Sequence, residues 1–132
     1  ATSWAQAGSP IPCFGTTHAD FWEDNIPITR KLKKKEIETH YEKNTGLVII
    51  ETLEGLNTIP SKCPGILVNS HGVFTWGESP KDALKNAEAI EMIAKMALNS
   101  LMINPDLNPI NKNLHDKHFY RKHGENKYYG QK

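Results

Sequence analysis

The most regular pattern of hydrophobic and polar positions runs from Ser79 to Met102. Apolar residues recur there at spacings of three and four, while charged and amide residues occupy the other side, and this period predicts an amphipathic helix. Ser79 suits the N-cap, Pro80 the first helical position and Asp82 the third position of a capping box. The apolar stripe consists of Ala83, Ala87, Ile90, Ala94, Ala97 and Leu101.

Apolar runs elsewhere in the chain predict short buried strands. Leu47–Leu53 is rich in β-branched side chains, and Gly65–Asn69 is apolar up to its polar final residue; both compositions favour a strand. Ile11–Thr17, which follows a proline, is also expected to form a short buried strand. Gly55–Pro64 contains two prolines and is expected to be a loop.

Helices are expected on either side of these strands. The first residues are typical of a helix that ends at Gly8, and Thr16–Asn25 is expected to be a loop or a short helical turn. The pattern over Thr29–Thr45 predicts a helix with one apolar side, which Gly46 would terminate. A weaker, polar helix is predicted for Asn111–Lys122. Strands followed by longer helices indicate a layered α/β domain.

The composition narrows the class of protein. The chain has 132 residues, enough for one domain with one core, and its 16 lysines and arginines nearly balance its 15 aspartates and glutamates. This balance argues against a nucleic-acid binder, which usually carries a basic excess. No apolar run approaches the roughly 20 residues of a membrane span, no secretory signal opens the chain, and two cysteines are too few for a disulfide scaffold. We therefore expect a cytoplasmic protein.

The start of the chain is unusual. It opens at Ala1 without a methionine, and Trp4–Ala7 looks like the end of an element already under way. We therefore expect residues 1–132 to be a single domain that forms the C-terminal part of a larger unit whose N-terminal part is missing. That N-terminal part would carry some of the chemistry.

Polar groups suited to chemistry occur in segments that lie far apart in the sequence. Gly15–Asp20 ends in a carboxylate, Asn69–Gly72 holds an imidazole, Lys117–Gly124 holds a guanidinium, and Tyr128–Gln131 holds a phenol. Each segment alone is a weak signal. Together they supply the groups needed for proton transfer on a phosphorylated substrate that is bound to a metal.

His71 and Asp20 each allow two interpretations. His71 follows an apolar strand and precedes Gly72, so it suits either a zinc ligand or a strand-end histidine bonded to the backbone. Asp20 lies beside Phe21 and Trp22, and desolvation by these rings would raise the pKa of its carboxyl and fit it for proton exchange. The alternative for this aspartate is a helix-capping or surface role.

Histidines and an arginine lie on one side of the predicted C-terminal helix. His115 and His118 are one turn apart, and Arg121 extends the same side. The two imidazoles suit either a metal-binding pair or a solvated helix face, because two ligands alone make no closed site. Arg121 is better interpreted as a phosphate partner, since a guanidinium binds phosphate oxygens bidentately.

The order and spacing of these segments resemble the class II aldolase and adducin-like family, in particular its L-ribulose-5-phosphate 4-epimerases. The resemblance runs from Trp4 to the C-terminus and is that of the C-terminal part of a family subunit. It implies a three-layer α/β/α fold with a mainly antiparallel central sheet, a homotetramer with active sites at subunit interfaces, and one zinc ion per subunit. The phosphate loop of the family would lie upstream of Ala1.

The resemblance also implies roles for residues of this chain. His71 is similar to a zinc ligand whose partners form a His-x-His pair upstream of the chain. Family members often have His-Ser-His where this chain has Asn69, Ser70 and His71, so only the last is carried over. Asp20 resembles one catalytic acid/base and Tyr129 the second, on a tail that docks across a subunit boundary.

Substrate-binding roles are implied in the same way. Thr16 would line the site, while His118 and Arg121 would hold the phosphate end of the substrate. Glu42 is similar to a family glutamate near the site, although its surroundings in the sequence also suit an exposed helix. His18 is a further candidate, either to orient the catalytic carboxylate or to act itself.

The activity that the resemblance implies is the interconversion of L-ribulose 5-phosphate and D-xylulose 5-phosphate. Carbon 4 is remote from the carbonyl and not acidic, so the implied route breaks and re-forms the C3–C4 bond by zinc-assisted retro-aldol and aldol steps. One alternative is a class II sugar-phosphate aldolase of the L-fuculose-phosphate type, which releases the fragments. Another is a non-catalytic oligomerisation module like the adducin head, since fold does not determine function. A zinc or nucleic-acid module built on the histidine-rich tail conflicts with the charge balance.

Overall fold

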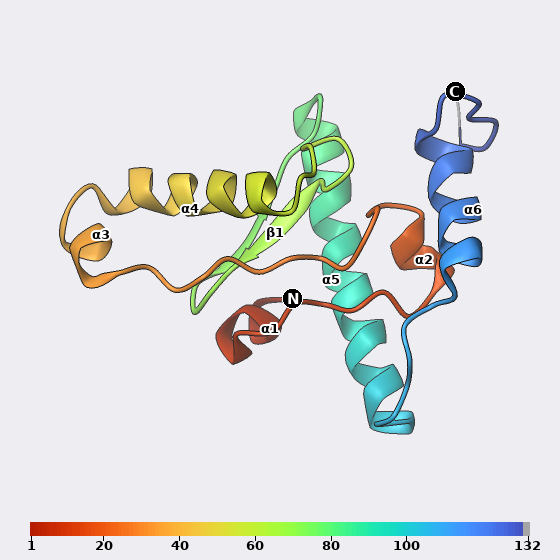
Figure 1. Ribbon diagram of the computed structural model, residues 1–132, viewed down its shortest axis with the longest axis horizontal. Coiled ribbons are helices and arrows are strands. Elements are labelled where there is room, and N and C mark those ends of the chain that lie inside the picture. Colours follow the sequence, from red (N-terminus) through yellow and green to blue (C-terminus); the bar gives the residue numbers. More distant parts are fainter. Residues whose placement is uncertain (131–132) are drawn as a thin grey trace.

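The structure is a computed structural model that describes residues 1–130. In chain order its elements are α1 (Thr2–Ala7), α2 (Thr16–Ala19), α3 (Lys34–Glu38), α4 (Tyr41–Gly55), β1 (Gly65–Val68), β2 (Gly72–Thr75), α5 (Pro80–Ile103) and α6 (Lys112–His123). Figure 1 shows α3 and α4 on the left, α2 and α6 on the right, and the β1–β2 hairpin and α5 between them. Within residues 1–130, none of the helices has both the length and the apolar character needed to cross a membrane.

Helix α5 confirms the strongest prediction from the sequence. The Ser79 hydroxyl accepts a hydrogen bond from the backbone N–H of Asp82 at 3.2 Å, and Pro80 occupies the first turn. The predicted apolar stripe is buried at Ile90, Ala94 and Ala97 and half-buried at its other positions. The buried side also includes Ala89 and Ile93, which the predicted stripe left out. Burying one isoleucine side chain contributes about 1.5–3 kcal/mol, so packing as well as capping stabilises α5.

Strand β1 is confirmed, and its partner β2 was not predicted. The two strands pair antiparallel, with Gly65 opposite Thr75 and Val68 opposite Gly72. Gly65 is required at its position, because a Cβ there would lie 2.9 Å from the carbonyl oxygen of Phe74 and from a methyl group of Thr75. Strand β2 escapes prediction because only its first residue is buried, so its hydrophobic pattern is weak.

The strand predicted for Leu47–Leu53 is wrong, because this segment belongs to α4. Its inward positions Thr45, Val48 and Leu53 fall on one helical face, whereas Leu47 and Ile50 are about half exposed. Tertiary packing on that face overrides the β-propensity of the individual residues. The cap predicted at Gly46 is wrong for the same reason, since this glycine lies inside α4.

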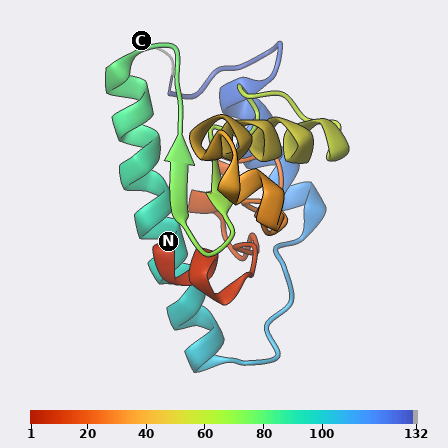
Figure 2. The same cartoon turned by 90° about the vertical axis from the view of Figure 1, so that its left-hand side faces the viewer.

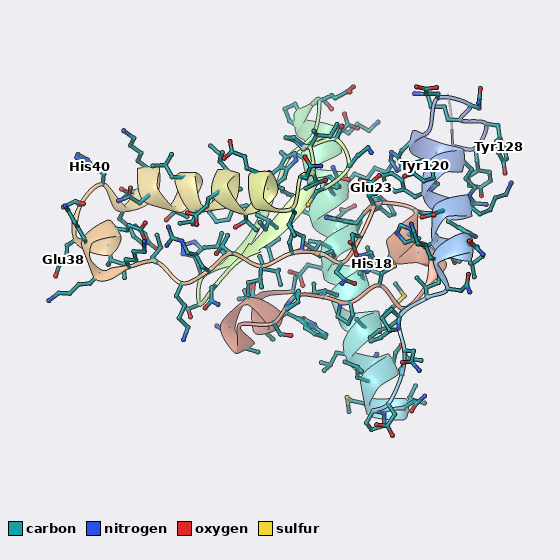
Figure 3. The ribbon with its side chains drawn as sticks, viewed as in Figure 1. His18, Glu23, Glu38, His40, Tyr120 and Tyr128 are labelled. Carbon is teal, nitrogen blue, oxygen red and sulfur yellow. The ribbon has the colours of Figure 1, made fainter. Side chains whose placement is uncertain are left out.

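The single helix predicted for Thr29–Thr45 is also wrong. Only the short helix α3 forms early in this segment, and the chain then bends before α4 begins. The bend lies at His40, whose φ of 49° is left-handed and which Figure 3 shows between the two helices. Arg30 stabilises the corner by bonding Glu36 of α3 and Glu51 of α4, each at 2.8 Å.

The N-terminal segment was predicted in part. Helix α1 ends at Gly8, which has a left-handed φ of 69° as expected for a glycine C-cap. The strand predicted for Ile11–Thr17 is wrong: one antiparallel bridge joins Ile11 to Ile26, and the end of the segment is already helix α2. The bridge does not extend into a ladder, because the next backbone donor, the N–H of Cys13, bonds the side-chain oxygen of Asn25 at 2.9 Å instead of a backbone carbonyl.

The core lies where α5 packs against the hairpin and the extended N-terminal segments. Trp22 is almost fully buried there, and its indole N–H donates to the carbonyl of Gly65 at 3.0 Å. Figure 2 shows the hairpin with α5 on one side and α3 and α4 on the other. The sheet within residues 1–130 is two-stranded, so the layered mixture of helix and strand is confirmed, whereas the three-layer arrangement around a larger central sheet is not.

Candidate functional site

A cluster of charged side chains forms where α2 meets α6. Asp20 follows α2 directly, and its Oδ1 accepts hydrogen bonds from His118 Nδ1 at 3.1 Å and from Arg121 Nη2 at 3.2 Å. Its other oxygen lies 3.1 Å from Lys122 Nζ. Only 17% of the Asp20 side chain is exposed. The first and the third of the four segments singled out in the sequence, 98 residues apart at Asp20 and His118, therefore meet.

The charge on Asp20 differs from the expectation drawn from the sequence. Burial acts most strongly on the pKa of this carboxyl and raises it, but the hydrogen bonds from Lys122, His118 and Arg121 together outweigh burial, and the net pKa is lowered. The predicted rise is therefore wrong. Phe21, the next residue after Asp20, also contacts a cation: the Lys122 ammonium lies over its ring, 5.4 Å from the ring centroid. The aromatic residue beside Asp20 therefore does not leave the carboxylate in apolar surroundings.

The C-terminal tail folds back onto the same cluster. The backbone N–H of Tyr129 donates to the carbonyl oxygen of Arg121 at 3.1 Å, and the N–H of Tyr128 donates to the same oxygen at 2.9 Å. The ring of Tyr129 lies against the guanidinium of Arg121, 4.1 Å from its central carbon. The predicted residues Asp20, His118, Arg121 and Tyr129 are thus brought together in one chain.

Thr16 and Lys122 complete the description of this cluster. Thr16 begins α2, and its carbonyl oxygen accepts from the backbone N–H of Asp20 at 2.9 Å. Lys122 was not singled out in the sequence, although its position four residues after His118 on a predicted helix places it on the same side. That spacing was the signal that could have identified it.

An open cavity of about 620 Å³ adjoins the cluster on the side of α6 and the tail. It is lined by basic side chains, Lys62, Lys117, Arg121 and His123, together with Asp116 and Glu125 among others. The Nε of Arg121 is buried and has no hydrogen-bond partner within residues 1–130. A guanidinium that lines a cavity with more basic than acidic side chains suits an anionic group.

Two other histidines have structural environments. His115 is buried rather than on a solvated face, and its Nε2 bonds the carbonyl of Trp22 at 3.2 Å. His18 is buried too, and its Nε2 bonds the carbonyl of Asp24 at 3.0 Å. Burial lowers the pKa of His18 to about 4, which keeps this ring neutral. Both imidazoles therefore tie segments of backbone together.

His71 lies elsewhere, in the turn between β1 and β2. Its ring is exposed, and its Nδ1 is hydrogen-bonded to the hydroxyl of Tyr41 at 3.0 Å. The neighbouring Ser70 donates its backbone N–H to Ala5 of α1 at 2.9 Å. In Figure 1 this turn lies next to α1, on the opposite side of the molecule from α2 and α6. The chain by itself therefore does not bring His71 to Asp20.

The surroundings of His71 fit one ligand position for a metal ion. Its Nε2 has no hydrogen-bond partner in the described part of the chain, and a neutral imidazole nitrogen is a common zinc donor. Residues 1–130 contain no group of three or more His, Cys, Asp or Glu side chains that could hold a metal ion. His71 alone therefore cannot complete a zinc site. Glu42, the glutamate singled out in the sequence, is exposed and lies in the first turn of α4, next to Tyr41.

Comparison with known proteins adds a family and relatives. Residues 1–98 match the family model described as Class II Aldolase and Adducin N-terminal domain. Over its full 132 residues, the chain shares 54% sequence identity with the L-ribulose-5-phosphate 4-epimerase UlaF of Salmonella paratyphi C (strain RKS4594). The identity is the same with the UlaF proteins of Salmonella choleraesuis (strain SC-B67) and Salmonella typhi. The chain spans 57% of the length of each of these relatives.

Proposed function

The chain belongs to the family of class II aldolase and adducin N-terminal domains, and from this premise we propose that it is part of an L-ribulose-5-phosphate 4-epimerase. The proposed reaction interconverts L-ribulose 5-phosphate and D-xylulose 5-phosphate. Support comes from the names of the relatives, whose identity extends over residues 99–132 beyond the family match. That last segment contains His118, Arg121 and Tyr129.

The observation that carries the proposal is the contact of Asp20 with His118 and Arg121. An acid/base carboxylate and a phosphate-binding pair need to lie within one substrate length of each other, and here they touch. Arg121 also lines the cavity, in which basic side chains outnumber acidic ones. We assign this guanidinium and His118 to the phosphate end of the sugar, with Thr16 lining the site.

Asp20 and Tyr129 are assigned to the proton transfers. Epimerisation at carbon 4 requires the C3–C4 bond to break and to re-form on the other face of the aldehyde fragment. One residue takes the proton of the C4 hydroxyl as the bond breaks, and the other returns a proton on the opposite face. Hydrogen bonds from Lys122, His118 and Arg121 keep Asp20 ionised, which is the form that can accept a proton. The phenol of Tyr129, whose hydroxyl can donate a proton, suits the acid.

The proposal includes one zinc ion per subunit, with His71 as one of its ligands. When bound, zinc supplies Lewis-acid stabilisation of the negative charge that develops on the sugar oxygens. His71 lies in the turn between β1 and β2 and Asp20 directly after α2, and Figure 1 shows these two parts of the chain on opposite sides. A site that uses both must therefore combine groups from two copies, which supports a homotetramer with active sites at its interfaces. We also propose the three-layer α/β/α arrangement for the intact subunit.

Product analysis tests the function. The intact protein, supplied with zinc and L-ribulose 5-phosphate, should form D-xylulose 5-phosphate. Release of dihydroxyacetone and a two-carbon aldehyde phosphate would instead identify an aldolase that uses the same first half-reaction. The family description also names adducin. A preparation that holds no divalent ion, and gains no activity from added zinc, would identify a non-catalytic module and overturn the proposal.

A further inference from the structure

We propose that Tyr41 is a positioning residue for His71, which it holds so that Nε2 is the ring nitrogen left to bind a ligand. The inference deepens the proposed function and rests on it, because it concerns the imidazole assigned to zinc. The observation behind it is the 3.0 Å hydrogen bond between the Tyr41 hydroxyl and Nδ1 of His71. These two residues are 30 positions apart in the sequence, and no local motif joins them.

Local backbone geometry brings the two side chains together. His40, with its left-handed φ of 49°, turns the chain sharply and makes Tyr41 the first residue of α4. Ser70, with a left-handed φ of 60°, closes the hairpin turn just before His71. A non-glycine residue with positive φ is uncommon and costs free energy. Two such residues therefore flank the pair, one on each segment that presents a ring.

The imidazole is held on more than one side. The ring of Phe74 on β2 lies 5.6 Å from the ring of His71, centroid to centroid, and the ring of Tyr41 lies at 6.4 Å. The backbone N–H of His71 donates to Val68 at 3.0 Å. These contacts restrict the rotation of the ring while leaving it exposed. The Nε2 edge is the part of the ring without a partner in residues 1–130.

A phenol is suited to this position because it can both donate and accept. When a cation binds Nε2, the proton of the neutral imidazole must lie on Nδ1, and Nδ1–H then donates to the phenol oxygen. When Nε2 carries the proton, the phenol O–H donates to Nδ1 instead. Tyr41 therefore keeps the ring oriented in both tautomers. Histidine ligands characteristically use their second nitrogen in this way, and loss of such a partner weakens metal binding about 10- to 100-fold.

Zinc affinity of the intact protein tests the proposal. The change Tyr41→Phe keeps the ring and removes only the hydroxyl. We expect it to weaken zinc binding about tenfold, at the lower end of the range because the pair is exposed, as measured by competition with a chelator. The matched control is Tyr120→Phe on α6, which removes a hydroxyl that donates to Glu23 at 3.1 Å (Figure 3). This control should leave zinc affinity unchanged.

Nitrogen-15 NMR of the His71 ring provides a readout that does not depend on activity. The zinc-loaded wild-type protein should show a metal-bound Nε2 and a protonated Nδ1 whose hydrogen exchanges slowly, and in Tyr41→Phe that exchange should become faster. A metal bound at Nδ1 in the wild-type protein would overturn the proposal. So would equal zinc affinity and equal hydrogen exchange in the two proteins.

The variant His71→Ala separates this proposal from the proposed function. If His71→Ala leaves zinc affinity unchanged, the assignment of His71 to the metal fails and the role of Tyr41 fails with it. If His71→Ala abolishes zinc binding while Tyr41→Phe has no effect on either measurement, only the positioning role fails. Loss of binding in the first variant and a tenfold loss in the second would support both.

Discussion

The two regions assigned to chemistry are built in opposite ways. At the contact of α2 and α6, Asp20 is 17% exposed and bonded to His118, Arg121 and Lys122. At the hairpin turn, His71 is exposed and has one side-chain hydrogen bond. A carboxylate that already accepts several hydrogen bonds is stabilised in its ionised form. An imidazole with one open nitrogen can still bind a ligand at that nitrogen. The first region is therefore complete within the chain, and the second needs further ligands.

The largest expected effect tests the charged cluster. In the intact protein, Asp20→Asn removes the carboxylate proposed as acid/base, and we expect the turnover number to fall about 100- to 10,000-fold while zinc content stays normal. Asp106→Asn, at an exposed aspartate outside the cluster, should turn over normally. Near-normal turnover of Asp20→Asn would remove this residue from the mechanism and leave the cluster with a structural role.

Tyr129→Phe is expected to have the next largest effect. Phenylalanine keeps an aromatic ring against the guanidinium of Arg121 and loses only the phenol proton, so a fall in turnover of about 100-fold would identify proton transfer as the lost function. The neighbouring Tyr128→Phe, which lies at the outside of the tail in Figure 3, is the matched control. Equal rates for the two variants would assign the tail to packing.

Acid titration of stability measures how tightly the cluster holds its charge. The pKa of Asp20 is lowered in the folded state from an unfolded value near 3.9. Its stabilising contribution is therefore full above about pH 4 and is lost as the pH falls through the lowered folded pKa. Denaturant unfolding should show wild type more stable than Asp20→Asn by about 1 kcal/mol at neutral pH, and the difference should shrink below about pH 4. A constant difference from neutral to strongly acidic pH would contradict the proposed ion pairs.

The smallest expected effect concerns one cation of the cluster. The hydrogen bond from Lys122 lowers the pKa of Asp20 more than any other partner does. We expect Lys122→Gln to raise that pKa toward its ordinary value, which carbon-13 NMR of the carboxyl group can follow. Lys117→Gln is the control, since Lys117 lies over the ring of Tyr128 instead. An unchanged Asp20 pKa in Lys122→Gln would show that His118 and Arg121 suffice.

The elements with strong local signals are the ones that could be predicted from the sequence. Helix α5 was predicted with its cap because Ser79, Pro80 and a long apolar stripe all favour the same structure. Helix α4 was mistaken for a strand because Leu47–Leu53 is β-branched and apolar, and only packing against the hairpin selects the helix. Strand β2 was missed because it is mostly uncovered.

The candidate residues show the same division. Asp20, His118, Arg121 and Tyr129 were selected from the sequence, and the structure brings them into contact. The direction of the Asp20 pKa shift was mistaken, because the number of cations around a carboxylate depends on which helix packs beside it. The pairing of Tyr41 with His71 was not anticipated either, since it joins the start of a helix to a hairpin turn.

The sequence by itself determined which groups were present, where the long helix begins and the family to which the chain belongs. These depend on residue identity and on interactions between residues a few positions apart, which can be deduced from order alone. The tertiary structure decided which groups meet, which charges are held and which edge of an imidazole stays open. Those depend on contacts between segments 30 to about 100 positions apart, whose free energy comes from burial and pairing in three dimensions.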